Sequence, residues 1–101
     1  MAELTFRAPL WAWRSRPDSW VFLTVPPEVS DAIDDATAAL PPRGFGSVRV
    51  EVRIGGSTWR TSVFPSSEES AFVLPVKRAV RSAEGLDVGD EAVVGLTVLD
   101  G

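Results

Sequence analysis

Cysteine, histidine and tyrosine are all absent from the 101 residues of this chain. Without cysteine the protein has no disulfide and no thiolate nucleophile, and without histidine it lacks the commonest general base and a frequent zinc ligand. These absences exclude thiol, disulfide and histidine-triad chemistry, and they favour a non-enzymatic protein with no cofactor and no metal site. The lack of cysteine also fits the reducing cytoplasm, where we expect the protein to reside.

Long apolar runs are missing too. No stretch approaches the roughly 20 apolar residues that a membrane-spanning helix needs, and the segment from Met1 to Leu4 has neither the basic nor the apolar part of a signal peptide. The net charge of −4 weakly repels nucleic acid and anionic membranes. We therefore expect a small molecule or another protein as the partner in preference to nucleic acid, with no role for membranes, and a monomer or weak homodimer.

Two parts of the sequence follow the same plan, an apolar strand, a proline and a short helix. The first has its strand over residues 20–25 and prolines at positions 26 and 27, and the second has its strand over residues 71–74 and a proline at position 75. The repeat predicts a pseudo-twofold β-barrel, mostly β, with one short helix at each end. The length of the chain predicts a single β-barrel domain over residues 1–101.

Alternating apolar and polar residues predict the other strands. Residues 4–13 form one of them, and Pro9 places it at a sheet edge or at a bulge because proline donates no ladder hydrogen bond. Residues 46–64 predict a hairpin that turns at Gly55-Gly56-Ser57, and residues 91–99 predict the closing strand. With the two strands of the repeat, the pattern indicates about six to seven strands.

The two helices carry charges of opposite sign. The first is expected to begin at Pro27, whose missing N–H costs nothing at the first helical position, and to reach Leu40. The second is expected to begin at Pro75 and to end at Gly85, a natural left-handed cap. The first has an acidic outer surface of Asp31, Asp34 and Asp35. The second has an apolar stripe of Val76, Ala79, Val80 and Ala83 and a basic flank of Lys77, Arg78 and Arg81.

A set of segments spread over nearly the whole chain is distinctive in combination. They are Phe6-Arg7-Ala8, Trp20-Val21-Phe22, Pro27-Glu28, Gly46 to Val50, Trp59 to Pro65, Leu74 to Arg81 and Gly85 to Asp90. Together they resemble a bacterial family known as domain of unknown function nineteen-oh-five, and the stretch from Leu74 to Asp90 is the most specific part. The resemblance implies a split β-barrel capped by helices, and it brings no established activity with it.

The stretch from Leu74 to Asp90 also resembles the swapped-hairpin barrel of AbrB-type and antitoxin-type transcription factors. Those proteins share the order of a proline, a basic helix, Gly-Leu and then Gly-Asp before a strand. The resemblance implies a small double-split β-barrel, which two chains build there and the two units of one chain would build here. It also implies DNA binding by basic residues of a dimer, whereas here the first unit is acidic and only the second is basic.

Four tryptophans, Trp11, Trp13, Trp20 and Trp59, are many for a chain of this length. Indoles beside the mouth of a barrel can stack on a sugar, a nucleobase or an apolar ligand, but a small barrel also needs bulky residues in its core. Trp20 and Trp59 lie on strands among apolar neighbours, which favours core positions. Trp11 and Trp13 lie on the polar face of their strand, which leaves a surface or cleft position open for them.

Arginines alternate along the predicted hairpin at positions 49, 53 and 60. Such a row either grips phosphate or carboxylate groups through bidentate hydrogen bonds or forms a solvated strand face on which Glu51 pairs with its neighbours. If the protein binds a small ligand, aromatic excess and arginine alternation place the site near this hairpin. The ligand-binding residues predicted on this basis are Trp11, Trp13, Arg53, Trp59 and Arg60.

Two other classes of function stay open. A nucleic-acid-binding barrel would use Lys77, Arg78 and Arg81, because cations near the start of a helix oppose the helix dipole and suit an anionic partner, unless nearby carboxylates pair with them. A protein-interaction domain would use an exposed apolar patch or a sheet edge, with the strand that contains Pro9 as the candidate.

The carboxylates predict no catalytic site. Asp31 and Asp35 share a helix face, but a solvated surface accounts for them better than a metal site or an acid–base pair. Asp90 follows Gly89 in a turn and is expected to hydrogen-bond to the local backbone.

Overall fold

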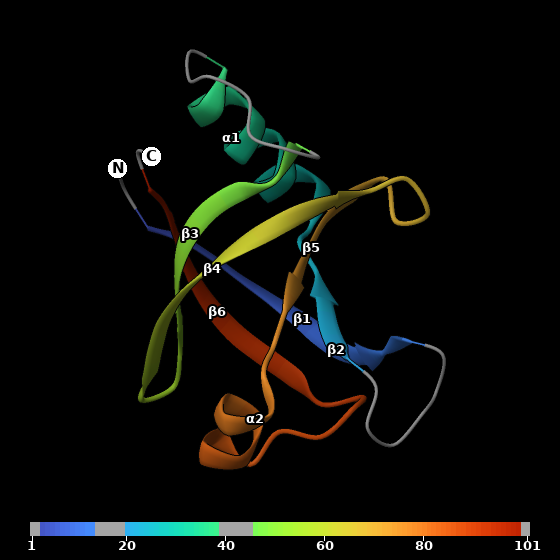
Figure 1. Cartoon of the computed structure of the whole chain (residues 1–101), viewed down its shortest axis with the longest axis vertical. Coiled ribbons are helices and arrows are strands. Elements are labelled where there is room, and N and C mark those ends of the chain that lie inside the picture. The colour runs from blue at the N-terminus through green and yellow to red at the C-terminus, as the bar shows by residue number, and fades with distance from the viewer. Residues whose placement is uncertain (1–2, 14–19, 39–45, 100–101) are drawn as a thin grey trace.

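The computed structural model describes residues 3–13, 20–38 and 46–99. Within them, six antiparallel strands close into a barrel in the order β1-β2-β5-β4-β3-β6, and a helix lies at each end of it (Figure 1). The predicted mostly β barrel with two short helices is therefore confirmed. The strands are β1 (Leu4–Ala12), β2 (Val21–Thr24), β3 (Val48–Ile54), β4 (Ser57–Ser66), β5 (Ala71–Pro75) and β6 (Glu91–Val98). The helices are α1 (Pro27–Thr37) and α2 (Arg78–Glu84).

The core of the barrel consists of the inward-facing residue of every second position along each strand. In the hairpin of β3 and β4, this alternation is the predicted one, with buried apolar residues on β3 between exposed arginines. Leu23 and Leu74 are fully buried and lie opposite each other in the β2–β5 pair. The buried residues of β3 are Val48, Val50, Val52 and Ile54.

The strand order is unchanged when the two halves of the chain are exchanged. Replacing β1 by β4, β2 by β5 and β3 by β6, and the reverse, gives the same closed order. The axis of this pseudo-twofold relation crosses the sheet at two places, between Leu23 and Leu74 and between Arg53 and Gly95, where counterpart residues are paired with each other. The repeated plan in the sequence is therefore a repeat of structure.

Backbone hydrogen bonds obey the same relation. Val25 N–H donates to Phe72 O at 2.9 Å, and Val76 N–H donates to Val21 O at 2.8 Å. Val76 is thus the counterpart of Val25, and Phe72 is the counterpart of Val21. These bonds prolong the central β2–β5 pairing beyond the assigned strands and carry the chain toward each helix.

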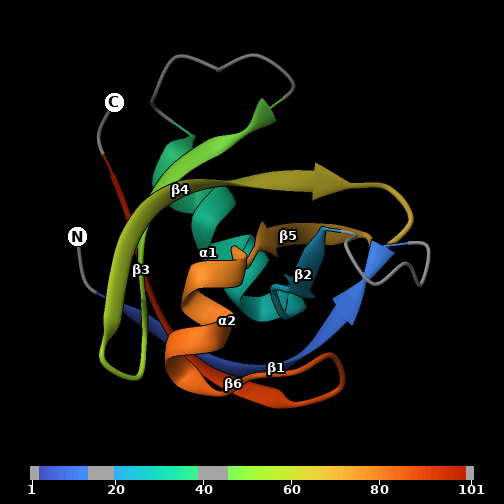
Figure 2. The same cartoon turned by 60° about the horizontal axis from the view of Figure 1, so that its bottom comes forward.

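The barrel is split twice, because each long strand changes its neighbour halfway. β1 pairs with β6 over residues 4–9 but with β2 only over residues 10–12. β4 pairs with β3 over residues 57–63 but with β5 only over residues 64–66. We call the gap between β1 and β2 the first split and the gap between β4 and β5 the second split. In Figure 2, α2 lies across the opening beside the long curved strand β4.

A proline stands at the start of each split. Extending the β1–β2 register places Pro9 opposite Thr24, and extending the β4–β5 register places Ser62 opposite Pro75. Val76 N–H points to β2, so the neighbouring Pro75 directs its nitrogen to β4, where it has no hydrogen to donate. Pro9 therefore lies where β1 has an unpaired edge on its β2 side, which agrees with the prediction of a sheet edge and limits that edge to a split within a closed barrel.

The sequence predicted that the second helix begins at Pro75, but the helix begins at Arg78. Pro75 is the last residue of β5, and Lys77 is an extended N-cap with φ −69° and ψ 156°. The chain stays extended this far because Val76 is still hydrogen-bonded to Val21 across the β2–β5 pair. The helix ends at Gly85 with φ 65°, as predicted.

The predicted apolar stripe of the second helix is also wrong in part. Val80 is the buried residue of α2, whereas Ala79 and Ala83 are exposed. α2 has seven residues, about two turns, and Val80 is the side chain that holds it against the barrel. Val76 is buried as predicted, but in the extended segment before the helix.

The first helix begins at Pro27, as predicted, and is described to Thr37. Its buried residues include Val29 and Ile33. The predicted acidic surface of Asp31, Asp34 and Asp35 is exposed, as a solvated face requires, and so is Glu28 in the first turn. The predicted end of the helix at Leu40 lies outside the described residues.

Glu3 and Arg53 form an ion pair above Gly95. Arg53 Nε donates to Glu3 Oε2 at 3.1 Å and Arg53 Nη2 donates to Glu3 Oε1 at 2.6 Å. This hydrogen bonding, and the charge of Glu3, raise the pKa of the Arg53 guanidinium above its ordinary value. The Glu3 carboxylate occupies the space that a Cβ at position 95 would need. Glycine at this position therefore makes room for the pair.

Gly95→Ala is expected to separate Glu3 from Arg53 and to leave the core intact, because the displaced atoms are the end of a flexible side chain. The variant should lower Tm by no more than Glu3→Ala does, and it should lower Tm no further when combined with Glu3→Ala. Thermal melts followed by circular dichroism test this. Additive losses in the double variant would show that the methyl group meets something other than Glu3.

Candidate binding site

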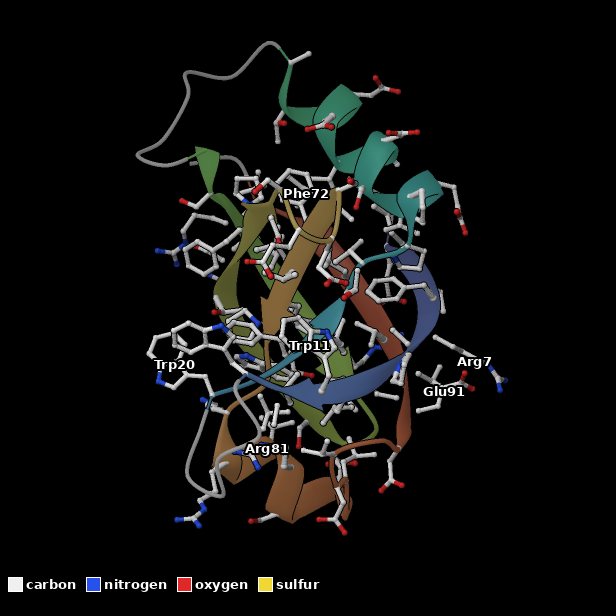
Figure 3. The ribbon with its side chains drawn as sticks, turned by 90° about the vertical axis from the view of Figure 1, so that its right-hand side faces the viewer. Arg7, Trp11, Trp20, Phe72, Arg81 and Glu91 are labelled. Atoms are coloured by element: carbon white, nitrogen blue, oxygen red, sulfur yellow. The ribbon has the colours of Figure 1, made fainter. Side chains whose placement is uncertain are left out.

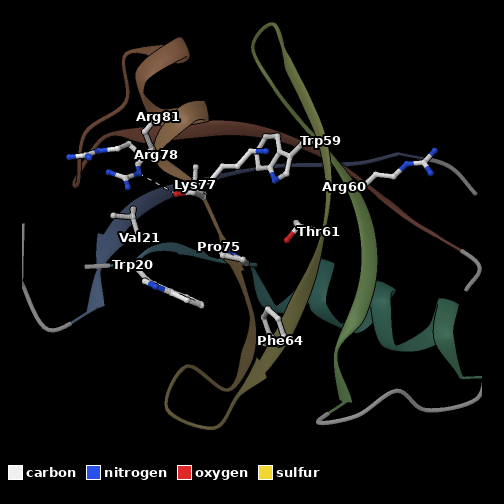
Figure 4. A pocket seen from close by; sticks show the side chains of 11 residues that line it. Trp20, Val21, Trp59, Arg60, Thr61, Phe64, Pro75, Lys77, Arg78 and Arg81 are labelled. Atoms are coloured by element: carbon white, nitrogen blue, oxygen red, sulfur yellow. Dashed lines mark hydrogen bonds between the residues drawn. The ribbon is translucent and has the colours of Figure 1, made fainter. Parts of the chain in front are cut away.

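A groove of about 550 Å³ occupies the second split, between β4 and the segment that leads from β5 into α2 (Figure 4). This volume lies within the roughly 300–1,000 Å³ that is typical of small-ligand sites. The groove combines aromatic side chains with cationic ones. Its aromatic residues are Trp20, Trp59 and Phe64, and its cationic residues are Arg60, Lys77, Arg78 and Arg81.

The aromatic side chains differ in how firmly the barrel holds them. Trp59 is partly buried and packs against the core, while Phe64 is 39% exposed and Trp20 is 68% exposed. The prediction that Trp20 is a core residue is therefore wrong. Val21 and Leu23 are the inward residues of β2, so alternation turns Trp20 outward. The alternation of residues 20–23 could be seen in the sequence and would have placed Trp20 on the outward face.

Two cations in this groove have no partner within the described residues. Lys77 and Arg78 are exposed and take part in no hydrogen bond or ion pair of their side chains with residues 3–13, 20–38 or 46–99. Arg81 is held in place, since its Nε donates to Val76 O at 3.2 Å (Figure 4). In Figure 4, the Lys77 side chain extends toward Trp59.

Carboxylates near α2 are engaged with the backbone and with a hydroxyl. Glu84 accepts hydrogen bonds from Ser57 Oγ at 2.6 Å and from Gly56 N–H at 3.3 Å. Asp90 Oδ2 accepts from the backbone N–H of Asp87 at 2.9 Å, which agrees with the local role expected for Asp90. Within the described residues, these carboxylates do not form ion pairs with the cations of the groove.

Arg60 and Arg53 direct their guanidinium groups elsewhere. Arg60 lies between Trp59 and Thr61 on β4 but points to the other side of the strand (Figure 4), where its Nε is 3.4 Å from Glu51 Oε1. Arg53 lies on β3 and pairs with Glu3, and it does not line this groove. Of the five residues predicted from the sequence for ligand binding, Trp59 and Arg60 line the groove, and Trp59 alone turns its side chain into it.

Trp11 and Trp13 line a neighbouring groove with Trp20, next to the turn between β4 and β5. The rings of Trp11 and Trp20 both contact the ring of Phe22, with centroids 5.2 Å and 6.1 Å from it, and both tryptophans are visible on one face in Figure 3. Trp13 is 53% exposed. Because Trp20 borders both grooves, an aromatic surface connects them.

A hydrogen-bonded chain crosses this aromatic surface. Trp11 Nε1–H donates to Thr24 Oγ1 at 3.0 Å, and Thr24 Oγ1 donates to Glu69 Oε1 at 2.9 Å. Under the pseudo-twofold relation, Trp11 and Thr24 are the counterparts of Phe64 and Pro75. The hydrogen bond that bridges the first split therefore has no equivalent in the second, because neither Phe64 nor Pro75 can form it.

The two splits also differ in charge at equivalent positions. Ser30 Oγ donates to Val25 O at 3.2 Å, just as Arg81 Nε donates to Val76 O at 3.2 Å. Ser30, which is buried, is therefore the counterpart of Arg81. In the same way Pro27, the first residue of α1, is the counterpart of Arg78, the first residue of α2. The cationic groove is thus a property of the second half of the chain.

These features define the class of protein as a small pseudo-symmetric split β-barrel with an aromatic and cationic groove at one split. The chain belongs to the family described as Domain of unknown function (DUF1905), whose model matches residues 6–96. A comparison with curated proteins finds no match. The resemblance to AbrB-type and antitoxin-type barrels stays a prediction.

Within the described ranges, no three acidic side chains are grouped in a way that would hold a metal ion. Neither α1 nor α2 combines the length and the apolar character that crossing a bilayer requires.

Proposed function

We propose that this protein is a non-enzymatic binding module whose ligand has a planar apolar part and an anionic group. The observation that carries the proposal is that the exposed Trp20 borders the same groove as Lys77 and Arg78, two cations without a side-chain partner among the described residues. The ligand would lie in the second split, with its planar part against the aromatic side chains and its anionic group toward α2.

The chemistry of the groove supports such a ligand. Indole rings provide large flat surfaces for stacking, and lysine and arginine bind phosphate or carboxylate through charge-assisted hydrogen bonds. The net charge of the chain is −4, so this cationic groove has a local sign opposite to that of the whole molecule. The described lining of the groove contains no carboxylate that would act as a general base, which favours binding over catalysis.

Titration with 1-naphthyl phosphate tests the proposal. The indole N–H signals of Trp20 and Trp59 are expected to shift in two-dimensional amide spectra, and those of the remaining tryptophans are expected to shift less. Naphthol and inorganic phosphate should each bind at least about tenfold more weakly, because each provides only one part of the ligand. No shift with 1-naphthyl phosphate up to millimolar concentration would contradict the proposal.

Three variants identify the contacts. Trp20→Ala, Lys77→Ala and Arg78→Ala are each expected to weaken 1-naphthyl phosphate binding by about threefold to tenfold, because each removes one stacking or charge-assisted contact. Arg49→Ala is the matched control, since Arg49 is an exposed arginine on β3 outside the groove. An equal loss of affinity in Arg49→Ala and Arg78→Ala would show that the probe responds only to overall charge.

A further inference from the structure

We infer that the groove accepts an extended acidic peptide, which pairs with the free edge of β4 as an added strand. The inference rests on the proposed function, because it names the class of ligand for the same groove. A peptide supplies both of the proposed ligand features through its side chains, and it adds backbone hydrogen bonds that a small molecule lacks.

The free edge of β4 follows from the strand pairing. On one side, β4 is paired with β3 throughout residues 57–63. On the other side, its pairing with β5 is confined to residues 64–66. The edge of residues 57–63 that faces the second split therefore has no strand beside it in the described structure. Unpaired strand edges of this kind are templates for an added strand.

The backbone groups that face the split can be assigned. Leu99 N–H donates to Arg49 O at 2.9 Å, so Arg49 faces β6, and its neighbours Val48 and Val50 face β4 because hydrogen-bonding direction alternates along a strand. Their partners on β4, Val63 and Thr61, face β3 in return. The residues between and beside them, Arg60 and Ser62, direct their N–H and C=O groups into the second split.

The opposite wall of the split gives the Ser62 C=O no donor, and its strand pairing with β4 ends at Phe64, before Ser62 and Arg60. Pro75 is the residue that the extended register places opposite Ser62, and its nitrogen has no hydrogen to donate. The chain beyond it, at Val76, is hydrogen-bonded to Val21 in the other direction. A ligand with its own N–H and C=O groups at strand spacing is therefore the natural complement of Arg60 and Ser62.

Charge selects an acidic peptide. The wall facing the β4 edge has Lys77 and Arg78, neither of which has a side-chain partner within the described residues. Side chains of an added strand alternate between two directions, so acidic side chains can meet these cations while apolar ones contact Trp20 or Phe64. The first split has Pro27 and Ser30 at the positions of Arg78 and Arg81, so an acidic peptide is not expected there.

The test uses a capped hexapeptide that alternates phenylalanine and glutamate, so that it has both the planar apolar groups and the anionic groups of the proposed ligand, added to the labelled full chain. A matched peptide has lysine in place of glutamate. Two further versions of the acidic peptide are N-methylated on alternate backbone nitrogens, one for each edge of the added strand. We expect the acidic peptide to bind, the lysine peptide to bind at least about tenfold more weakly, and only one of the two N-methylated versions to lose binding.

Amide hydrogen exchange and a variant locate the added strand. The acidic peptide should slow the exchange of the Arg60 and Ser62 amides at least about tenfold, with little change at Thr61, which already faces β3. Ser62→Pro removes an N–H that faces the split and spares the hydrogen bonds to β3, so it should weaken the peptide about tenfold and leave 1-naphthyl phosphate binding unchanged. If that variant does not fold, the N-methylated peptides provide the test.

The outcomes separate this inference from the proposed function. Binding of 1-naphthyl phosphate without binding of the acidic peptide would overturn the inference and leave the proposed function standing. Equal binding of both N-methylated peptides, or unchanged exchange at Arg60 and Ser62, would also overturn the inference. Failure of both ligands would reject the inference and the proposed function together.

Discussion

Leu74→Ala is expected to lower the free energy of unfolding by about 3 kcal/mol, within the roughly 2–5 kcal/mol that truncation of a buried leucine costs. Leu74 has no exposed surface, and it lies opposite Leu23 at the pseudo-twofold axis. The surrounding side chains come from strands that are hydrogen-bonded into a closed barrel, so they can move little to fill the cavity. Urea unfolding followed by tryptophan fluorescence measures the loss, with an unchanged m-value.

Two further variants test whether the loss of stability comes from the central position of Leu74 in the barrel. Leu23→Ala should cost a similar amount, and the double variant should cost less than the sum of the single ones, because the two cavities are in contact. Val93→Ala is the control, since Val93 is 51% exposed on β6, and it should change stability by less than about 0.5 kcal/mol. A loss below about 1 kcal/mol in Leu74→Ala would show that the centre of the barrel is not tightly packed.

Ser30→Ala is expected to cost about 1–3 kcal/mol, which is large for the removal of one oxygen atom. The Ser30 hydroxyl donates to Val25 O and accepts from Phe72 N–H, both at 3.2 Å, and the residue is 6% exposed. It therefore joins α1 to β5 in the interior. Alanine would leave the Phe72 N–H buried without an acceptor, and an unsatisfied buried group costs its full desolvation.

The matched control for this variant is Ser82→Ala. Ser82 is the exposed serine of α2, and alanine in its place should be neutral or slightly stabilising because alanine has the higher helix propensity. In Ser30→Ala, the Phe72 amide should also exchange with solvent faster than in the unsubstituted protein. Equal stability of the two variants would mean that the hydroxyl of Ser30 is replaced by water at no cost.

The strands were predictable because alternation along a strand is a local property. The inward and outward residues of β3 are buried and exposed as the sequence indicates, and the prolines mark the ends of the repeated strands. The start of α2 was not predictable in the same way. The extended conformation of Val76 depends on its hydrogen bond to Val21, a residue far away in the sequence, so the proline alone placed the helix too early.

The candidate site was predictable only in its parts. The sequence showed an excess of tryptophan and a basic cluster at Lys77 and Arg78 as separate clues, for two different functions. The second split brings these clues together in one groove, and that depends on the register of β4 against β5. Arg53 was assigned to the site because it alternates with apolar residues, but its partner Glu3 lies 50 positions away, and no local pattern indicates such a pair.

The pairing of β1 with β6 has a consequence for how this chain folds. Leu4 lies opposite Leu96, and Pro9 lies opposite Glu91, so the first and last strands are neighbours. Proteins dominated by such distant contacts fold slowly, typically in milliseconds to seconds. Without β6, both β1 and β3 would lose a neighbour. During synthesis, the first strands must therefore wait for the last one, and the barrel can close only after Val98 has been added to the chain.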